Sequence, residues 1–436
     1  MTKECTIKKI LAREVFDSRG VPTIEVDIFT DSGWGRNAAP FGAPGSRGEY
    51  EASAYGSVGI TGALDVVIHE LAPRLVGTDT SKLSQCDSII REFDGTNNFD
   101  RIGGNTASAL SIAIAKAAAD SLKVPLYKFL APDSDSFSLP FPLGNIIGGG
   151  AHSAGAAPDM QEHLVLPLSA NSIKEAVKLN ILVHEETGKL LEKRDNNFTG
   201  GTDDEHAWAA NLDDYQALEV VSEACTIVTR ETGMEFRLGL DVAADRLWDT
   251  NKEQYVYSRE GKFRNTDEQI DFMENLVKKF NLCYVEDAFH SNDYQAFAEL
   301  RRRVGDLCLV CGDDLLATNT QRTSEGVKKG SVNAMVVKVN QIGTLTDARK
   351  TNDYAQSQGI RTIISHRSGE TDDHTIAHIG VAWNCAMIKT GVLGGERLTK
   401  LNELIRIEEN LRECAKSMED VNKPFEILRG DFCDEC

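Results

Sequence analysis

The stretch NAMVVKVNQ, residues 333–341, is a short apolar run that leads into a charged side chain, Lys338. Five other runs between residues 236 and 391 have the same form: FRLGLDVA, LCYVEDAF, LCLVCGDD, RTIISHRS and AMIKTG. Segments with helical periodicity separate them, and strands that alternate with helices are typical of a parallel sheet. These six strand endings predict a parallel β/α barrel.

In such a barrel the last side chains of every strand reach the same rim, where catalytic groups lie. A single charge at a strand end is usually just solvated, but a charge at six successive endings makes that interpretation poor. We therefore expect the charged groups to face one pocket. They are Asp241, Glu286, Asp313, Lys338, His366 with Arg367, and Lys389.

The three carboxylates of Asp241, Glu286 and Asp313 form an oxygen-ligand set suited to Mg²⁺. A lysine among metal ions and a second lysine can have its pKa lowered enough to act as a base near neutrality. Lys338 is therefore the candidate base. A structural ion pair is the alternative role for Lys338.

Two further carboxylates precede these strands. Glu162, in PDMQEHLVLP, and Glu205, in NNFTGGTDDEHAWAANL, lie in polar segments that we expect to be loops. A carboxyl group there could donate a proton to a leaving hydroxide. Loop carboxylates are more often merely solvated, so spacing alone does not assign them.

The organisation of the chain predicts two domains. Residues 1–130 mix strand-like runs such as VPTIEVDIFT with a helical stretch, NTASALSIAIAKAAADSL, and a Gly-rich loop, PFGAPGSRGEYEA, which indicates an N-terminal α+β domain. Prolines and polar residues mark a linker at residues 131–143. The barrel is expected at residues 144–412. Periodicity is lost after about Glu409, and residues 413–436 are expected to be a tail.

Composition excludes some classes of partner. The chain has 67 acidic and 47 basic residues and a net charge of −20 at pH 7, which opposes binding to nucleic acid or to an anionic membrane surface. An anionic substrate must be held by a few convergent cationic side chains or by bound cations. The N-terminus lacks the features of a signal peptide and no uncharged apolar run approaches about 18 residues, so we expect a cytoplasmic protein.

The ten cysteines are expected to be reduced thiols. Cys308 and Cys311 lie on one predicted strand, where residues three apart point to opposite faces, so core packing is favoured over metal binding. Cys433 and Cys436 end the chain in CDEC, where a frayed tail is the simpler interpretation and a redox or metal role stays open.

Seven strings together resemble the enolase family over residues 12 to 410: REVFDSRGVPTIEV, GLDVAAD, VEDAF, GDDLLATNT, VVKVNQIGTLTDA, SHRSGETDD and LTKLNELIRIEE. The resemblance implies an α/β fold, an enolase-like modified TIM barrel with an N-terminal α+β domain. It implies a hydro-lyase that dehydrates 2-phosphoglycerate to phosphoenolpyruvate with Mg²⁺, a step of glycolysis and gluconeogenesis. It also implies a homo-oligomer, a dimer or an octamer.

The same resemblance implies roles for single residues. Asp241, Glu286 and Asp313 would bind the first metal ion. Lys338 would be the base, and Glu205 the general acid, assisted by Glu162. The substrate would be contacted by the remaining residues: His366, Arg367 and Ser368 at the phosphate, Lys389 at the carboxylate, and His152 and Gln161 from the loop side.

The sequence departs from the family pattern on its loops. The family's PSGASTG loop is here PFGAPGSRG, with Phe41 and Pro44 in place of two serines, and only Ser46 remains to reach the substrate. This leaves open whether a second Mg²⁺ binds. In DDEHAWA, His206 and Ala207 replace two family glycines, and the loop after His152 is one residue longer. Two alternatives follow: a paralogue acting on a related phosphorylated or phosphonate hydroxy acid, and a non-catalytic binding protein, which the retained acid and base argue against.

Overall fold

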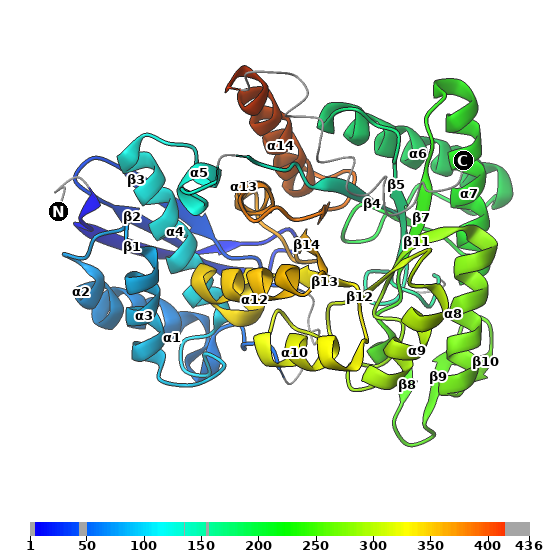
Figure 1. Ribbon diagram of the computed structural model, residues 1–436, viewed down its shortest axis with the longest axis horizontal. Coiled ribbons are helices and arrows are strands. Elements are labelled where there is room, and N and C mark those ends of the chain that lie inside the picture. Colours follow the sequence, from blue (N-terminus) through cyan, green and yellow to red (C-terminus); the bar gives the residue numbers. More distant parts are fainter. Residues whose placement is uncertain (1–4, 43–49, 135, 154–156, 415–436) are drawn as a thin grey trace.

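Two hydrophobic cores divide the chain, one in an N-terminal domain and one in a barrel (Figure 1). The structure, a computed structural model, describes residues 5–42, 50–134, 136–153 and 157–414. The N-terminal domain has an antiparallel meander of β1 (Lys9–Phe16), β2 (Pro22–Phe29) and β3 (Trp34–Ala38). Its helical elements are η2 (Gly56–Val58), α1 (Gly59–Val66), η3 (Val67–Leu71), α2 (Ala72–Leu75), α3 (Leu83–Asp94), α4 (Gly104–Leu122) and α5 (Leu126–Leu130).

Helix α4 joins the two cores. It is buried on almost every side because one face packs in the N-terminal core and the opposite face, with Ile112 and Ala115, packs in the barrel core. A Cβ built on Gly35 of β3 would lie 2.2 Å from the carbonyl oxygen of Ala113, so glycine allows the sheet to approach the helix closely. The small side chains of the alanine-rich helix α4 thus allow both domains to pack closely against it.

The barrel is closed and has eight principal strands: β4 (Phe141–Gly148), β5 (Glu162–Leu166), β7 (Arg237–Asp241), β11 (Leu282–Glu286), β12 (Leu309–Gly312), β13 (Ala334–Val337), β14 (Arg361–Ser365) and β15 (Met387–Lys389). β5 is antiparallel to both β4 and β7, all other neighbours among these eight are parallel, and β15 pairs with β4 to close the circle. The strands are almost completely buried, as expected where helices cover the outside of a parallel barrel.

Helices alternate with these strands on the outside of the barrel (Figure 1). Capping boxes begin two of them, at Asp213 and at Asn265. The helices are α6 (Ile173–Arg194), α7 (Asp214–Thr232), α8 (Thr266–Phe280), α9 (Tyr294–Val304), α10 (Thr320–Lys329), α11 (Val339–Ile342), α12 (Leu345–Ser357), α13 (Thr375–Ala382) and α14 (Gly395–Cys414). Shorter elements are β6 (Trp208–Ala209), η4 (Ala244–Arg246) and an outer sheet of β8 (Trp248–Asp249), β9 (Gln254–Tyr257) and β10 (Lys262–Arg264).

The architecture confirms the predicted fold class, including the six parallel strand endings and the helix at residues 105–122. Three local expectations differ from the structure. β4 begins at Phe141, within the segment predicted to be a linker, and α14 extends to Cys414, beyond the expected loss of periodicity at Glu409. Glu162, expected on a loop, is the first residue of β5, because β5 runs antiparallel and so begins at the catalytic rim.

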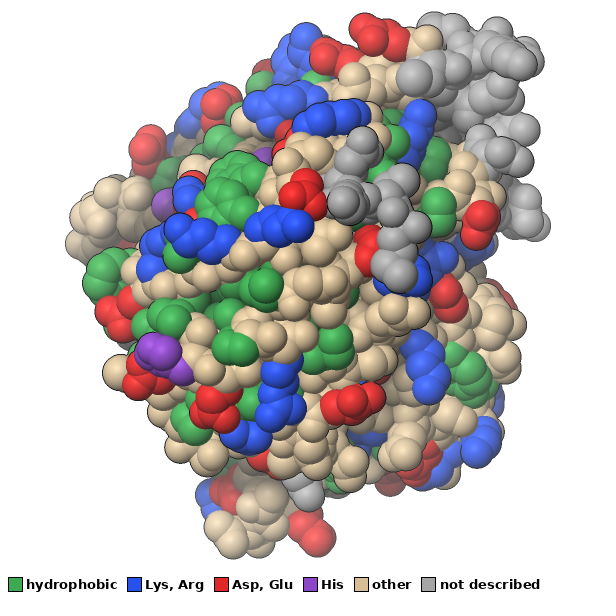
Figure 2. All heavy atoms as spheres, turned by 90° about the vertical axis from the view of Figure 1, so that its left-hand side faces the viewer, with side chains coloured by type: hydrophobic (Ala, Val, Ile, Leu, Met, Phe, Trp, Pro, Cys, Tyr) green, Lys and Arg blue, Asp and Glu red, His purple; other side chains and the backbone are tan. Residues whose placement is uncertain are grey.

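Cys308 and Cys311 are both buried free thiols, as predicted, whereas Cys433 and Cys436 lie outside the described residues. Among the described residues, no helix is both long and apolar enough to span a membrane. On the N-terminal face in Figure 2, Lys and Arg side chains lie among acidic and uncharged ones and form no continuous basic area.

Candidate functional site

The charged strand endings meet at one mouth of the barrel, where they form what we call the strand wall: Asp241, Glu286, Asp313, Lys338 and Lys389. Asp241, Glu286 and Lys389 are the last residues of β7, β11 and β15, and Asp313 and Lys338 directly follow β12 and β13. All five side chains are buried or nearly so. The strand register therefore places these charges together, as the sequence predicted.

Lys389 lies among three carboxylates. Its Nζ is 2.7 Å from Asp241 Oδ2, 2.8 Å from Glu286 Oε2 and 3.2 Å from Glu162 Oε1. Burial alone would lower the pKa of Lys389, but the three negative charges outweigh it and raise the pKa well above its usual value. This part of the mouth therefore carries an excess of negative charge that one lysine compensates only in part.

This excess of negative charge also acts on Glu286. Burial, and then the charge of Asp241, raise the pKa of Glu286 to about 7. The hydroxyl of Tyr284 donates a hydrogen bond to Glu286 Oε2 at 2.7 Å. Oxygen atoms of Glu286, Asp287 and Asp313 lie within 4.8 Å of one another. Crowded carboxylates of this kind are stabilised by a bound cation.

Asp287 supports this cluster and was not predicted to belong to the site. Its carboxylate accepts hydrogen bonds from the backbone amides of Asp313, at 3.1 Å, and Asp314, at 2.8 Å. Its backbone has a positive φ of 43°, which is costly for an aspartate and recurs at functional sites. The string VEDAF contained the residue, but only the fold shows that it holds the turn after β12.

Lys338 forms a buried ion pair with Asp313. Burial lowers the pKa of Lys338, but the charge of Asp313 outweighs that effect, so the pKa is raised. The sequence predicts a lowered pKa for this lysine among metal ions and a second lysine, and this stays a prediction; in the chain alone, Arg367 and Lys389 each lower the pKa in part. The amide of Gln341 donates to Asp313 Oδ1 at 2.9 Å and to Glu51 Oε1 at 2.7 Å, which links this pair to the N-terminal domain.

Arg367 and His366, directly after β14, form the cationic side of the mouth. Arg367 donates to Asn340 Oδ1 at 3.0 Å and lies 3.3 Å from Glu51 Oε2. Arg397 of α14 donates to His366 Nδ1 at 2.8 Å, so this nitrogen accepts and the ring is neutral. Burial lowers the pKa of His366 to about 3, in agreement with a neutral ring.

Arg397 is the principal residue that sequence reasoning missed. It is fully buried, and besides His366 it donates to the carbonyl oxygens of Arg367 at 2.7 Å, Ser368 at 2.6 Å and Asp204 at 3.2 Å. Ser368 thus joins this network through its backbone. Arg397 follows GVLGGE in the sequence and does not lie at the end of an apolar run, so no local pattern marks it. Its role becomes clear only from the packing of α14 against the mouth.

Opposite these strands lies a second wall, which we call the loop wall: His152, Asp203, Asp204, Glu205 and His206. His152 Nδ1 lies 2.6 Å from Asp204 Oδ1 and 3.8 Å from Glu205 Oε1, and His152 Nε2 lies 3.9 Å from Glu162 Oε1. Burial would lower the pKa of His152, but the charges of Glu205, Asp204 and Glu162 raise it to about 9. His152 is therefore cationic at neutral pH.

The pKa values of the two candidate acids are shifted in opposite directions. Burial raises the pKa of Glu162 well above its usual value despite the nearby Lys389 charge. Burial also acts on Glu205, but the N–H of His366, 3.4 Å away, and the charge of His152 outweigh it and hold the pKa of Glu205 well below its usual range. Glu162 therefore holds a proton more readily than Glu205.

The remaining predicted residues also have definite places. The amide of Gln161 donates to Asp241 Oδ2 at 3.1 Å, so Gln161 contacts the strand wall. Pro44 and Ser46 of the altered Gly-rich loop lie outside the described residues, whereas Phe41 bonds through its amide to the carbonyl oxygen of Gly369 at 3.0 Å. His206 has a φ of 65°, in the left-handed region that favours glycine, and its Nε2 lies 3.3 Å from Glu396 Oε1.

These residues fit a divalent cation at the strand wall. The donors are carboxylate oxygens, the ligand type that Mg²⁺ prefers, and their negative charge exceeds what Lys389 and Lys338 balance. Glu162 Oε2 is buried with no hydrogen-bond partner among the described residues, as expected for an atom that faces a bound ligand. The mouth also supplies Arg367 and Lys389 as cationic groups for an anionic substrate.

Comparisons with known proteins agree with this geometry. Residues 7–130 match the family model of the enolase N-terminal domain, and residues 136–422 match that of the enolase C-terminal TIM barrel domain. The chain is 46% identical over 408 residues to an enolase of Methanothermobacter thermautotrophicus, covering 94% of this chain and 97% of the relative. It is 47% identical over 405 residues to an enolase of Halorubrum lacusprofundi (93% and 99% covered), and 44% identical over 409 residues to an enolase of Pyrobaculum aerophilum (92% and 96% covered).

Proposed function

Because the chain belongs to the enolase family, we propose that it is a hydro-lyase that converts 2-phosphoglycerate reversibly to phosphoenolpyruvate, with Mg²⁺ as its cofactor. The single observation that carries the proposal is the strand wall. One buried lysine, Lys338, lies beside a cluster of carboxylates and a second lysine at one barrel mouth. A binding protein would have no need for this combination.

The reaction requires removal of a proton next to a carboxylate, which is very weakly acidic until the resulting charge is stabilised. A Mg²⁺ ion bound by Asp241, Glu286 and Asp313 would supply that stabilisation electrostatically. Sites of the enolase superfamily use a Lys or His base with one or two Mg²⁺ ions. Lys389, which already lies within 3.2 Å of three carboxylates, would hold the substrate carboxylate.

Lys338 is the proposed base. It must lose its proton to act, and the Asp313 charge that raises its pKa opposes this loss. Arg367, on the other side, lowers the pKa of Lys338 and would hold the substrate phosphate together with His366 and Ser368. The side chain of Lys338 is only 15% exposed, which limits exchange of its proton with solvent.

Glu205 is the proposed general acid, and Glu162 and His152 its support. The hydroxyl group leaves with a proton, and Glu162, with its raised pKa, holds a proton more readily than Glu205, whose pKa is lowered. His152 lies between them, 3.8 Å from Glu205 and 3.9 Å from Glu162, and can pass the proton along. His152 and Gln161 would also contact the substrate. The leaving group therefore meets its acid on the loop wall, opposite the base.

The proposal is tested by incubating the purified protein with 2-phosphoglycerate and Mg²⁺ and following phosphoenolpyruvate by its absorbance. We expect turnover that stops when a chelator removes the metal and returns when Mg²⁺ is added. A folded, metal-loaded protein that gives no product would reject 2-phosphoglycerate, and a screen of related phosphorylated and phosphonate hydroxy acids would then identify the substrate.

Three finer points stay predictions. A second Mg²⁺ ion is undecided by the described residues, because the loop at residues 43–49 is not among them. Assembly into a dimer or an octamer and a cytoplasmic location are proposed from the family membership and from the acidic composition. Size-exclusion chromatography with light scattering measures the oligomeric state directly.

A further inference from the structure

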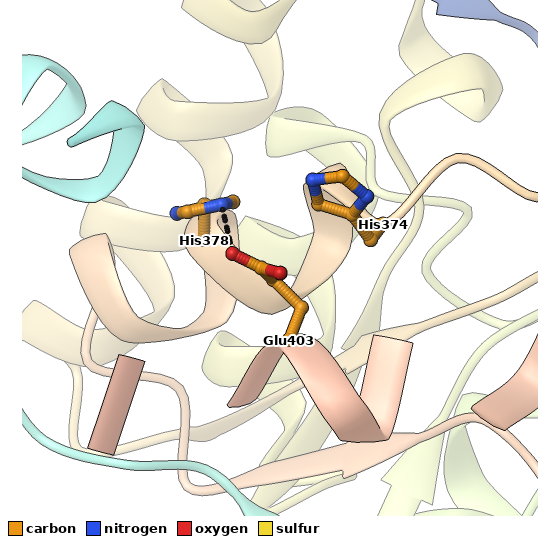
Figure 3. A group of neighbouring side chains, drawn as sticks. All are labelled: His374, His378 and Glu403. Atoms are coloured by element: carbon orange, nitrogen blue, oxygen red, sulfur yellow. Dashed lines mark ion pairs between the residues drawn. The ribbon is translucent and has the colours of Figure 1, made fainter. Parts of the chain in front are cut away.

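A second cluster of metal-binding side chains lies on the outside of the barrel, between α13 and α14. It consists of His374, His378 and Glu403 (Figure 3). His374 is the N-cap of α13 and His378 lies one turn later, so both imidazoles are on one face of the helix. Glu403 of α14 points up between them (Figure 3). None of the three belongs to the catalytic mouth.

The spacing of the three groups suits a single ion. Their nearest ligand atoms all lie within 4.8 Å of one another, and His378 Nε2 is 3.2 Å from Glu403 Oε1. Two ligands bound to one zinc ion at about 2 Å and at tetrahedral angles are roughly 3.3 Å apart. The His378 and Glu403 atoms already have this separation, and the less buried ring of His374 can turn to complete the set.

Neighbouring groups hold two of the three ligands in place. Arg406 donates to Glu403 Oε2 at 2.7 Å, which leaves Oε1 facing the imidazole. The ring of Tyr127 stacks on His378, with ring centroids 6.1 Å apart and planes inclined by 11°. Contacts of this kind orient metal ligands and reduce the entropy lost on binding.

We propose that His374, His378 and Glu403 bind one divalent transition-metal ion of the zinc type, with water completing its coordination. Two imidazoles and one carboxylate are a zinc ligand set, whereas Mg²⁺ and Ca²⁺ prefer oxygen donors alone. His374 and Glu403 are partly exposed, so water and the ion can reach the cluster.

The ion would fasten two helices that both reach the catalytic mouth. α13 follows the loop that carries His366 and Arg367, and α14 carries Arg397, which contacts both of those residues. The ion contributes stability and takes no part in proton transfer. The proposal is therefore independent of the proposed reaction.

The test measures Zn²⁺ binding to the full chain by calorimetry. Competing thiols are removed with Cys433→Ser and Cys436→Ser, and millimolar Mg²⁺ occupies the carboxylate site. We expect one tightly bound Zn²⁺ per chain, a higher melting temperature with Zn²⁺ than without, and, with Co²⁺ in its place, the visible absorption of a nitrogen- and oxygen-bound ion.

Variants assign the ion to this cluster. His374→Ala and His378→Ala should each weaken Zn²⁺ binding at least about 10-fold and abolish the rise in melting temperature. His69→Ala, which removes an exposed helical histidine of the N-terminal domain, is the matched control and should bind as the parent does. Circular dichroism and turnover of 2-phosphoglycerate establish that each variant is folded.

Two outcomes would overturn the proposal. Equal Zn²⁺ affinity in the His374→Ala and parent proteins would place the ion elsewhere, for example at His152, Glu162 and Glu205. If the parent protein binds no Zn²⁺ at micromolar concentrations, the cluster is not a metal site and contains only the His378–Glu403 ion pair. His374→Ala decides the matter even if His378→Ala does not fold, because His374 is the less buried ring.

Discussion

The strand wall and the loop wall face the same mouth but are built in different ways. On the strand wall the register of neighbouring strands sets the positions: Asp241 is paired with Glu286 on one side and with Glu162 on the other. On the loop wall, Asp204 is held by Arg19 and Arg397, which are distant in sequence. A strand places a charge by local geometry, whereas a loop needs partners from elsewhere. Substitutions on the strand wall should therefore affect chemistry, whereas substitutions of the loop-wall residues that only support Glu205 and His152 should affect stability and pH dependence.

The largest expected effect is that of Lys338→Ala. Loss of the base should lower turnover of 2-phosphoglycerate roughly 1,000-fold or more. Turnover is followed by phosphoenolpyruvate absorbance and the fold by circular dichroism, with the exposed Lys328→Ala as the matched control. Retention of more than a tenth of the activity would remove Lys338 from the chemistry.

Arg397→Ala should affect the loop wall and the cationic side of the mouth, since it leaves three carbonyl oxygens and His366 Nδ1 without their donor. At about 1 kcal/mol for each of these four hydrogen bonds, we expect a loss of roughly 4 kcal/mol in the free energy of unfolding. Urea denaturation measures this, and Arg412→Ala, near the exposed end of the same helix, is the control. Equal stability of the two variants would contradict the role assigned to Arg397.

Asp313→Ala should act through the metal. Removing one carboxylate from the strand wall should raise the Mg²⁺ concentration needed for half-maximal activity at least about 10-fold. Loss of a group that only supports a metal ligand already lowers metal affinity by about 10-fold, and Asp313 is proposed as a ligand itself. Activity is measured as a function of Mg²⁺, with the exposed Asp306→Ala as the control. An unchanged requirement for Mg²⁺ would remove this ligand assignment.

Asp203 should give the loop wall a pH dependence. Burial, and then the charge of Glu205, raise the pKa of Asp203 from 3.8 to about 7, so folding favours its protonated form. This contribution is complete below pH 3.8 and is lost as the pH rises toward 7. The full shift corresponds to roughly 4 kcal/mol, at about 1.4 kcal/mol for each pKa unit.

The Asp203→Asn variant tests that dependence. It keeps the oxygen that accepts from the amides of Glu205 and Ala207 but cannot ionise, so it should be the more stable protein at pH 8 and not at pH 4. Denaturation is measured between these values, with the exposed Asp133→Asn as the control. A stability difference that does not vary with pH would refute the assignment.

His206→Gly should have the smallest effect. Glycine relieves the positive φ but loses the contact with Glu396 and gains freedom in the unfolded chain, so stability should change by no more than about 0.5 kcal/mol. Thermal denaturation and the Michaelis constant are the readouts. A fall in turnover above 10-fold, with an unchanged Michaelis constant, would instead give His206 a part in proton transfer.

The barrel and its strand wall follow from the pattern of residues along the chain. Each strand is a short apolar run that ends in one charge, and a parallel barrel carries every such ending to the same rim. The positions of Asp241, Glu286 and Lys389 in the sequence are therefore enough to predict that these side chains lie together. The family resemblance also predicts roles for Glu205 and His152, although nothing local to those loops marks them.

The electrostatic state of the mouth, in contrast, depends on tertiary packing. Arg397 and Glu51 carry no pattern in the chain, because they reach the site by packing of distant segments. The same packing places Asp313 beside Lys338 and so raises its pKa, keeps His366 neutral and raises the pKa of Glu162. Periodicity reports which residues share a strand or a helix face, whereas a pKa depends on every charge within a few ångströms, whatever its position in the sequence.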